Sequence, residues 1–392
     1  MAPNDAFRSI DELTLAHQRL LIRVDFDVPL DGEGRVASDR KLHAALPTIN
    51  KAIKEGARVV LATHLGAEGE PVVSLEPVAQ RLAELLGQEV YLPDECVGDA
   101  ARKVVSDLRE GQVCLLENLR FAPEESQNEE AFARKLLGLC DMYVGEAFGC
   151  SHLTYASLVA LPRMVKERAI GYRFKLELDA LARVTQGAQK PFVGILGGAK
   201  LSQSQAMLEA MMSRCSSILV GGAVANTLLA ARSVDMKESA IEKDQLAFAR
   251  NVLTRARNYN IDLVLPVDVL VGSIKEASVG QSVSVGSIPD GSSAFDIGPR
   301  TLEIYRQKLA GAKLALWHGA LGVCENPAFA GGTQGMLSAL GEASAFGIVT
   351  SDVLSTLASE DESKIGFVST GGVASLVFIE GKKLPGAVAL SG

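Results

Sequence analysis

Short apolar runs alternate along the chain with longer segments whose apolar residues recur every three or four positions. The longer segments predict amphipathic helices, most clearly at 42–57, 74–87 and 244–259. The short runs are rich in β-branched residues and predict strands. These predicted strands lie at 20–26, 58–65, 113–119, 141–148, 191–198, 216–223, 261–269, 314–321, 345–351 and 365–372. Because the strands are almost continuously apolar, they indicate parallel sheets covered by helices on both faces.

The number of strands and the length of the chain favour two domains. Ten strands are many for one open sheet, and 392 residues are enough for two cores. The pattern therefore predicts an α/β protein with two doubly wound parallel-sheet domains. We expect the boundary near 165–180, where the charged segment 166–184 predicts one connecting helix, and we expect the Gly/Ser-rich segment 272–293 to be poor in strands.

Charge and composition exclude several classes of function. Thirty-nine basic and 47 acidic residues give a net charge of -8, which argues against non-specific binding to nucleic acids or anionic membranes. The six cysteines show no CxxC or metal-ligand spacing and predict free buried thiols. With no signal-peptide pattern and no apolar run of 18 residues, the sequence predicts a cytoplasmic protein.

Polar side chains follow the predicted strands of the first half. Ligands of doubly wound folds bind outside the carboxyl ends of the strands, so these side chains are site candidates. Arginines among them favour a small phosphorylated or carboxylated anion. The alternative is that Arg120 and Asp25 form a structural ion pair. The candidates are Asp25, Asp27, Arg40 (expected in a polar loop), His64, Glu117, Asn118, Arg120, Glu146 and His152.

Glycine clusters follow the predicted strands of the second half. They are Gly197-Gly198 with Lys200 after them, Gly221-Gly222, Gly319 with Gly322, and Gly371-Gly372. Such turns let backbone N–H groups face an anion, although tight packing is an alternative reason for them. Neither a P-loop nor a GxGxxG motif is present. A nucleotide site facing an anion site is typical of a phosphoryl transferase that closes on a hinge.

Twelve collinear motifs make the chain resemble the phosphoglycerate kinase family over its whole length. They include RVDFDVPL (23–30), SDRKLHAALPTI (38–49), LLENLRF (115–121), YVGEAFGCSH (143–152), GGAKLS (197–202), GVCENPAFAGGT (322–333) and STGGVASLVFIEGKKLPGAVAL (369–390). The resemblance implies a phosphoglycerate-binding domain at 1–170, a nucleotide-binding domain at 171–374, a hinge helix, and a tail, 375–392, that returns to the first domain.

The resemblance also implies a reaction and its residues. ATP and 3-phosphoglycerate would form ADP and 1,3-bisphosphoglycerate with Mg²⁺, in a monomer. Arg40 and Lys200 would be catalytic, Glu325 would hold the ribose, and Asp352 would hold the metal. The implied 3-phosphoglycerate site contains Asp25, Asp27, Arg40, His64, Arg120 and His152. The implied nucleotide site contains Gly197, Gly198, Lys200, Gly221, Gly222, Glu325, Asp352, Gly371 and Gly372.

Several site positions depart from the family pattern. Ala67, Leu153 and Ser204 each replace a cation, and Asp27 replaces a neutral asparagine. Other departures are Tyr155, His318, Val349, Thr350, Ser351, Val353 and Val373, of which Val349, Thr350, Ser351 and Val373 replace glycines of phosphate loops. We therefore expect impaired activity. The alternatives are a catalytically silent paralogue that binds a nucleotide or phosphorylated metabolite in a regulatory role, or a scaffold or an enzyme with another substrate.

Overall fold

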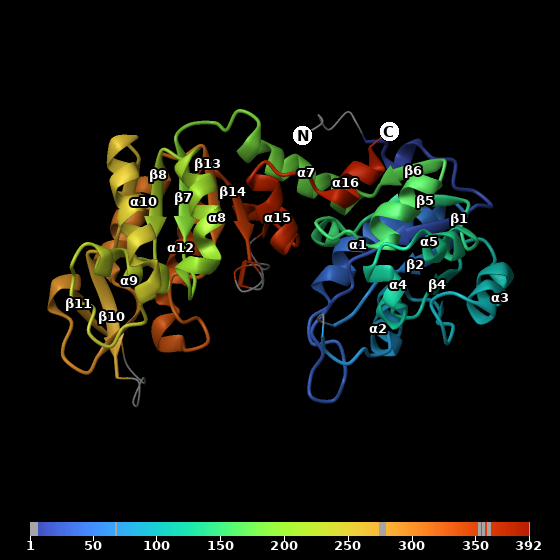
Figure 1. The fold of residues 1–392 in the computed structure, drawn as a ribbon, viewed down its shortest axis with the longest axis horizontal. Helices are drawn as coiled ribbons and strands as arrows, with labels where there is room; N and C mark the ends of the chain where they lie inside the picture. Colours follow the sequence, from blue (N-terminus) through green and yellow to red (C-terminus); the bar gives the residue numbers. More distant parts are fainter. Residues whose placement is uncertain are drawn as a thin grey trace. The chain divides into compact units, whose positions relative to one another are not determined.

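The computed structural model describes residues 7–66, 69–273, 280–351, 354, 357–358 and 362–391. The chain divides into two compact units, Met1–Asp179 with Gly381–Gly392 and Ala180–Glu380 (Figure 1). Helix α7 (Tyr172–Thr185) contains the boundary between them. Which ligand each unit binds stays a prediction.

The first unit contains a parallel six-stranded sheet in the order β3-β4-β2-β1-β5-β6. Its strands are β1 (Arg19–Arg23), β2 (Arg58–Ala62), β3 (Val90–Tyr91), β4 (Val113–Leu115), β5 (Met142–Gly145) and β6 (Glu167–Ile170). Its helices are α1 (Arg40–Lys54), α2 (Glu76–Leu86), α3 (Asp99–Asp107), α4 (Pro123–Ser126), α5 (Glu130–Leu137), α6 (Leu161–Met164) and α16 (Pro385–Leu390). Shorter turns are η2 (Ile10–Glu12), η3 (Leu119–Phe121), η4 (Phe148–Cys150) and η5 (Ala156–Ala160). The C-terminal helix α16 lies beside β6 (Figure 1).

The second unit contains a parallel six-stranded sheet in the order β15-β14-β13-β7-β8-β9 and a small antiparallel sheet in the order β11-β10-β12. The strands are β7 (Phe192–Leu196), β8 (Ser217–Val220), β9 (Asp262–Val264), β10 (Asp268–Gly272), β11 (Gln281–Ser284), β12 (Ser293–Ile297), β13 (Leu314–His318), β14 (Phe346–Thr350) and β15 (Gly366–Val368). The helices are α8 (Leu201–Met212), α9 (Gly222–Ala231), α10 (Leu246–Asn258), α11 (Pro299–Ala310), α12 (Gly331–Glu342), α14 (Glu362–Ile365) and α15 (Gly372–Ile379). Shorter turns are η6 (Lys243–Gln245), η7 (Val285–Ser287) and η8 (Pro327–Phe329).

Burial on both faces of the sheets explains the apolar runs. Leu20, Leu21 and Ile22 of β1 are fully buried, and successive side chains of a strand point to opposite faces. All five residues of β7 are buried in the same way. The predicted fold class, two doubly wound parallel-sheet α/β domains, is therefore confirmed. None of the described helices combines the length and the apolar character that a membrane crossing requires.

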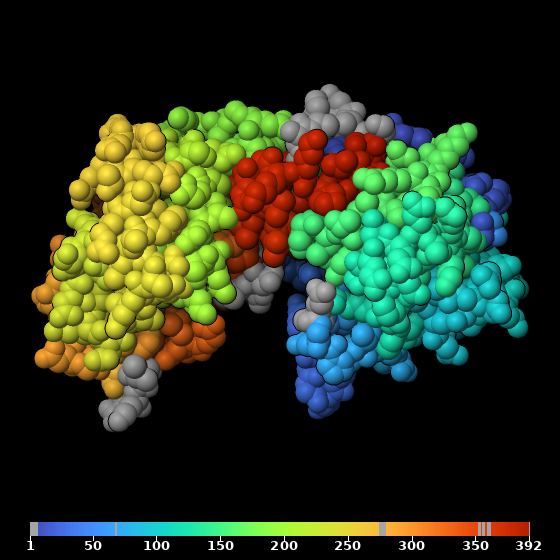
Figure 2. All heavy atoms as spheres, in the orientation of Figure 1, coloured from blue at the N-terminus to red at the C-terminus, as the bar shows by residue number. Residues whose placement is uncertain are grey.

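Three local predictions are wrong. The segment 166–184 is not one helix, because β6 pairs with β5 and buries Ala169 and Ile170 before α7 begins. The run 261–269 divides into β9 and β10, which lie in different sheets on either side of Pro266. The segment 272–293 contains β11, an exposed polar edge strand whose pattern resembles a loop. Figure 2 shows the described residues of this segment, in yellow to orange, at the surface of the second unit.

Both large sheets reverse their strand order beside the first strand of the unit. In the first unit the reversal lies between β1 and β5, and in the second between β7 and β13. A crevice opens at such a switch point, outside the carboxyl ends of the strands. The topology therefore provides each unit with one natural place for a ligand.

Candidate functional site

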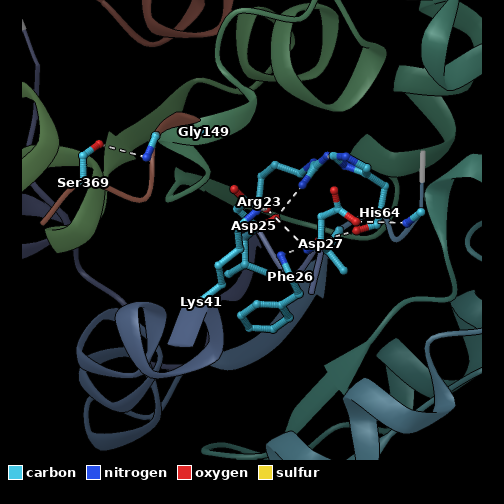
Figure 3. Close-up of polar contacts among 12 residues, drawn as sticks. Arg23, Asp25, Phe26, Asp27, Lys41, His64, Gly149 and Ser369 are labelled. Atoms are coloured by element: carbon cyan, nitrogen blue, oxygen red, sulfur yellow. Dashed lines mark hydrogen bonds and ion pairs between the residues drawn. The ribbon is translucent and has the colours of Figure 1, made fainter. Parts of the chain in front are cut away.

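Six polar residues meet at the carboxyl edge of the first sheet, and we call them the strand-end cluster. They follow β1, β2, β4 and β5 or begin α1: Asp25, Asp27, Lys41, His64, Arg120 and His152. Figure 3 shows Asp25, Asp27, Lys41 and His64 on their elements. Arg40 is the first residue of α1, so its expected position in a polar loop is wrong. Its catalytic role stays a prediction.

Lys41 is a cation that the sequence analysis missed. Its Nζ lies 3.1 Å from Oδ1 of Asp25, and the two side chains are 29% and 14% exposed. Burial alone would lower the pKa of Lys41, but the surrounding negative groups, with the Asp25 carboxylate foremost, together outweigh burial and raise it. Asp25 thus pairs with Lys41, and the alternative of an ion pair with Arg120 is not formed among the described residues. Side chains in the first turn of a helix tilt toward its start. A predicted helix start at this position would therefore have indicated that Lys41 points toward the ends of the strands.

Asp27 adds a second carboxylate to the cluster. Its Oδ1 accepts a hydrogen bond of 3.0 Å from the N–H of Gly66. Burial raises the pKa of Asp27, and the charge of Asp25 raises it further. An anionic ligand must therefore approach two acidic groups, of which Lys41 compensates one.

The two histidines of the cluster supply hydrogen bonds rather than positive charge. Burial, followed by the charge of Arg23, lowers the pKa of His64 to about 3. Burial also lowers the pKa of His152, whose Nδ1 lies 2.9 Å from the carbonyl of Gly149. Arg120 contributes charge, and its buried Nε has no hydrogen-bond partner among the described residues. The fixed cations of the cluster are therefore Arg120 and Lys41.

Two other carboxylates at the strand ends hold helices in place. Glu117 accepts hydrogen bonds from Ser74 Oγ (2.7 Å) and the N–H of Leu75 (2.8 Å), at the start of α2. Glu146 accepts the Thr48 hydroxyl and the N–H of Arg173 (3.1 Å), at the start of α7. Negative groups at helix N-termini satisfy free N–H groups, so both residues have a structural role.

Replacing Lys41 with methionine is expected to weaken the binding of a small phosphorylated anion roughly tenfold, because a charge-assisted contact contributes about 1.5–3 kcal/mol. Calorimetric titration with 3-phosphoglycerate, the ligand that the sequence resemblance implies, measures the effect. Lys54→Met changes an exposed lysine at the other end of α1 and is the matched control. Arg40→Met is measured beside these two variants. Binding that weakens in Arg40→Met and not in Lys41→Met would contradict the assignment.

A cavity of about 590 Å³ lies at the switch point of the second unit. The backbones of Gly198, Gly222, Gly319 and Gly322 form part of its wall, and Glu325 lies on it. Its other lining residues include Asn226, Glu238, Phe295, Cys324 and Ser351. A cavity with glycine walls, an aromatic ring and a few polar groups suits a planar base with a hydroxylated sugar.

Close backbone packing explains the glycines of this wall. A Cβ on Gly197 would lie 2.0 Å from the Ala320 oxygen. The N–H groups of Gly197, Gly198 and Gly222 donate to backbone carbonyls at 2.8 Å, and so does that of Gly221. These N–H groups are therefore already bonded within the protein and do not face an anion, and close packing accounts for glycine at these positions. The part that these residues take in nucleotide binding stays a prediction. The N–H of Gly371 likewise donates to Ser369 Oγ (3.0 Å), while Gly372 begins α15.

Lys200 is exposed at the residue before α8 and makes no hydrogen bond or ion pair with another described residue. Ser204 is buried on the same helix, with its Oγ 3.7 Å from the place that a Cβ on Gly198 would take. The start of α8 already holds a carboxylate, because Glu242 accepts the N–H (3.0 Å) and hydroxyl of Ser202. Lys200 follows Gly198 by two residues and is the cation that the sequence analysis predicted beside these turns.

Val349 is not part of a phosphate loop. It is fully buried within β14, where it pairs with Trp317 and Val368, so our placement of it is wrong. Thr350 ends the strand, and its hydroxyl lies 3.1 Å from Nδ1 of His318. Ser351 lines the cavity with φ of +123°, a conformation that favours glycine. The predictions on Ala67, Asp352 and Val353 lie outside the described residues.

Comparisons with known proteins agree on one family. A sequence model described as phosphoglycerate kinase matches residues 10–382. The phosphoglycerate kinases of Anaeromyxobacter sp. (strain Fw109-5) and Chlorobaculum tepidum are 45% and 40% identical, over 99% and 98% of this chain and 100% and 99% of theirs. The structures of phosphoglycerate kinase from Coxiella burnetii and Pyrococcus horikoshii OT3 both align with a TM-score of 0.86, at 33% and 30% identity over 98% of each chain. The chain therefore belongs to the phosphoglycerate kinase family, whose members are phosphotransferases.

Proposed function

We propose that the chain transfers a phosphoryl group between ATP and 3-phosphoglycerate, as a cytoplasmic monomer, with a lower rate than its relatives. The observation that carries the proposal is that both switch points retain a ligand-type site. The strand-end cluster has Lys41, Arg120 and two histidine side chains for an anionic acceptor. The cavity of the second unit has Glu325 on its wall for a ribose hydroxyl.

Each residue then has a defined task. Lys200 would contact the transferred phosphoryl group, Lys41 and Arg120 would hold the acceptor, and Arg40 is kept as a further candidate. Gly197, Gly198, Gly221 and Gly222 would shape the base pocket by their close packing, and Gly371 and Gly372 would face the phosphates. Phosphoryl transfer depends on such positioning and on charge stabilisation.

Mg²⁺ fits this proposal as a partner of the nucleotide. Among the described residues no group of three or more His, Cys, Asp or Glu side chains could hold a metal alone. Mg²⁺ is usually held by one or two carboxylates together with substrate phosphates, so a site without such a group is compatible with it. We propose Asp352 as its carboxylate ligand. Bound Mg²⁺ would neutralise charge on the transferred group.

The reduced rate follows from three features of the described sites. Leu153 packs against an apolar cluster where the family pattern has a cation, and Ser204 is buried where it has another. Asp27 adds a carboxylate 3.0 Å from the N–H of Gly66. Each charge-assisted contact contributes about 1.5–3 kcal/mol, so the losses reduce transition-state binding. The free energies of neighbouring contacts are not additive, so the total loss is not their simple sum.

A coupled kinase assay, together with calorimetric titrations of ADP and 3-phosphoglycerate, tests the proposal. We expect binding of both ligands and a kcat/KM more than tenfold below that of the Anaeromyxobacter relative measured in parallel. Turnover within tenfold of that relative would contradict the reduced rate. No heat with either ligand would contradict the function itself.

A second candidate is binding without turnover, in a regulatory role. The adjacent carboxylates of Asp25 and Asp27 favour it, because both would face the negative charge of the acceptor. It predicts heat on titration with ADP and no turnover above that of a Lys200→Met variant in the same assay.

Replacing Leu153 with arginine is expected to lower the free energy of unfolding by about 1–3 kcal/mol. It should not restore the rate of the relatives, because Ser204 and Asp27 are unchanged. Leu153 packs against the buried cluster that contains Tyr155, Leu158 and Val159, so a guanidinium there must leave this cluster or stay poorly solvated. Urea denaturation and the coupled assay measure the two effects. Leu153→Met, which keeps an apolar side chain of similar volume, is the control. A variant that is as stable as the wild type and turns over as fast as the relatives would contradict both expectations.

A further inference from the structure

Arg23, the last residue of β1, is fully buried behind the strand-end cluster. Its Nη2 lies 2.8 Å from Nδ1 of His64, and its Nε donates to Ser157 Oγ at 2.8 Å (Figure 3 shows Arg23 and His64). Its Nη1 donates to the carbonyl of Val24. A buried guanidinium is kept only where its N–H groups find acceptors, and here three atoms do.

A buried carboxylate lies on the other side of this arginine. Ser157 is fully buried in η5, and both its hydroxyl and its N–H (2.9 Å) donate to Glu125 of α4. Glu125 is 1% exposed. Burial raises the pKa of Glu125, whereas the charge of Arg23 lowers it. The chain of contacts therefore runs from Glu125 through Ser157 and Arg23 to His64.

The direction of the last hydrogen bond determines the state of His64. A guanidinium has only donors, so Nδ1 must accept and the ring proton must be on Nε2. Nε2 has no hydrogen-bond partner among the described residues and is not enclosed. The charged groups that face the ring are Arg23, Asp25, Arg120 and Lys41. A protonated ring would place an N–H against the N–H of Arg23, which disfavours the cationic form.

We propose that Arg23 is a positioning residue, which holds His64 as the uncharged Nε2–H tautomer so that its free N–H can donate to an anionic oxygen of the acceptor. Ser157 and Glu125 hold Arg23 in the orientation that this requires. His64 then provides a hydrogen bond of fixed direction, independent of pH, beside the cations Lys41 and Arg120. The inference rests on the proposed function only in naming the acceptor as a phosphorylated carboxylate.

Nitrogen NMR of the full chain with ¹⁵N-labelled histidine tests the inference without any ligand. The chain has five histidines, and His64→Gln identifies the signals of His64. We expect a protonated Nε2, an unprotonated Nδ1 and no titration of His64 from pH 8 to pH 5. His17 and His43, which are exposed, serve as internal references in the same spectra. Titration of His64 near its ordinary pKa of about 6.5, or a proton on Nδ1, would overturn the inference.

Ser157→Ala removes the acceptor of Arg23 Nε with little change of volume. We expect it to release Arg23, so that His64 shows a second tautomer or begins to titrate, while circular dichroism shows a folded protein. Should this variant not fold, Glu125→Gln serves the same purpose. Unchanged His64 signals in a folded variant would overturn the part given to Ser157 and Glu125.

Binding separates positioning from general stability. Ser157→Ala and His64→Leu are expected to weaken 3-phosphoglycerate binding roughly 3–10-fold, and His64→Gln, which keeps a donor, to weaken it less. ADP binding should not change. Equal losses in His64→Leu and His64→Gln would overturn the donor role. A wild-type protein that binds no 3-phosphoglycerate would overturn the proposed function. In that case the role of Arg23 is still decided by the tautomer and the titration of His64 in the NMR spectra.

Discussion

Replacing Lys200 with methionine is expected to lower kcat by about 10²–10³-fold, the effect of removing one preorganised group that stabilises transition-state charge. Lys200 is exposed beside the cavity of the second unit and is not bound to another described residue, so its charge is available to a ligand. Ser204 cannot replace it, because a buried hydroxyl carries no charge. The coupled assay measures kcat, and calorimetry with ADP shows whether ground-state binding changes less than the rate.

Lys313→Met is the matched control for this experiment. Lys313 is also exposed, but it precedes β13 and so lies at the amino edge of the same sheet, away from the cavity. It should leave both kcat and ADP binding unchanged. A Lys200→Met variant that retains the wild-type kcat would show that the phosphoryl group is stabilised elsewhere, or that the measured turnover is not that of the chain.

Glu146 is expected to make the first unit less stable as the pH rises from its ordinary pKa toward neutrality. Burial raises the pKa of Glu146 to about 7, although the Thr48 hydroxyl and the N–H groups of Arg173 and Phe174 bind the carboxylate. Between its ordinary pKa and pH 7 the unfolded chain is ionised while the folded chain keeps the proton. Folding therefore takes up a proton, and the free energy of unfolding falls by roughly 3 kcal/mol across this window.

The difference between the wild type and Glu146→Gln isolates this contribution. His64 acts in the opposite sense: its pKa of about 3 in the folded state makes stability rise with pH below its ordinary value. Both proteins are denatured at pH 5 and at pH 8. The difference between their free energies of unfolding at each pH removes the contribution of His64, which both proteins share. Circular dichroism follows both units, and the fluorescence of Trp317, the single tryptophan, reports the second unit alone. Glu129→Gln, at an exposed position, is the control, and an equal pH dependence of wild type and Glu146→Gln would contradict the prediction.

The pattern of apolar residues predicted the fold class because the signal is local. Strands such as β1 and β7 are buried on both faces, so their continuous apolar runs distinguish them from loops and indicate parallel sheets. The same pattern failed at β11, whose polar residues lie on an exposed edge. It also failed at β6, where two charged residues precede two buried apolar ones. This short pattern resembles the first turn of a charged helix, so β6 was predicted as part of the helix that follows it.

The site was predicted in outline, since the ends of the strands can be read from the sequence. Asp25, His64 and Arg120 follow three neighbouring strands, and the structure brings them to one edge. Lys41 was missed because the helix was predicted to start at residue 42, whereas α1 starts at Arg40. Such a shift changes which side chain is expected to point back to the sheet. The glycines of the cavity were found, but their N–H groups donate to carbonyls of other turns, which only the packing of those turns reveals.

Sequence alone determined the two parallel sheets, their carboxyl edges, the family and the list of substituted positions, because each depends on residue type and local spacing. The tertiary structure decided what each polar group binds: Asp25 pairs with Lys41, Glu146 holds the start of α7, Leu153 joins an apolar cluster, and Arg23 links His64 to Ser157. Arg23 and its partners lie far apart in the chain, by 41 residues for His64 and 134 residues for Ser157. A hydrogen bond or ion pair requires atoms within about 3–4 Å, and only the folded backbone brings such residues to that distance.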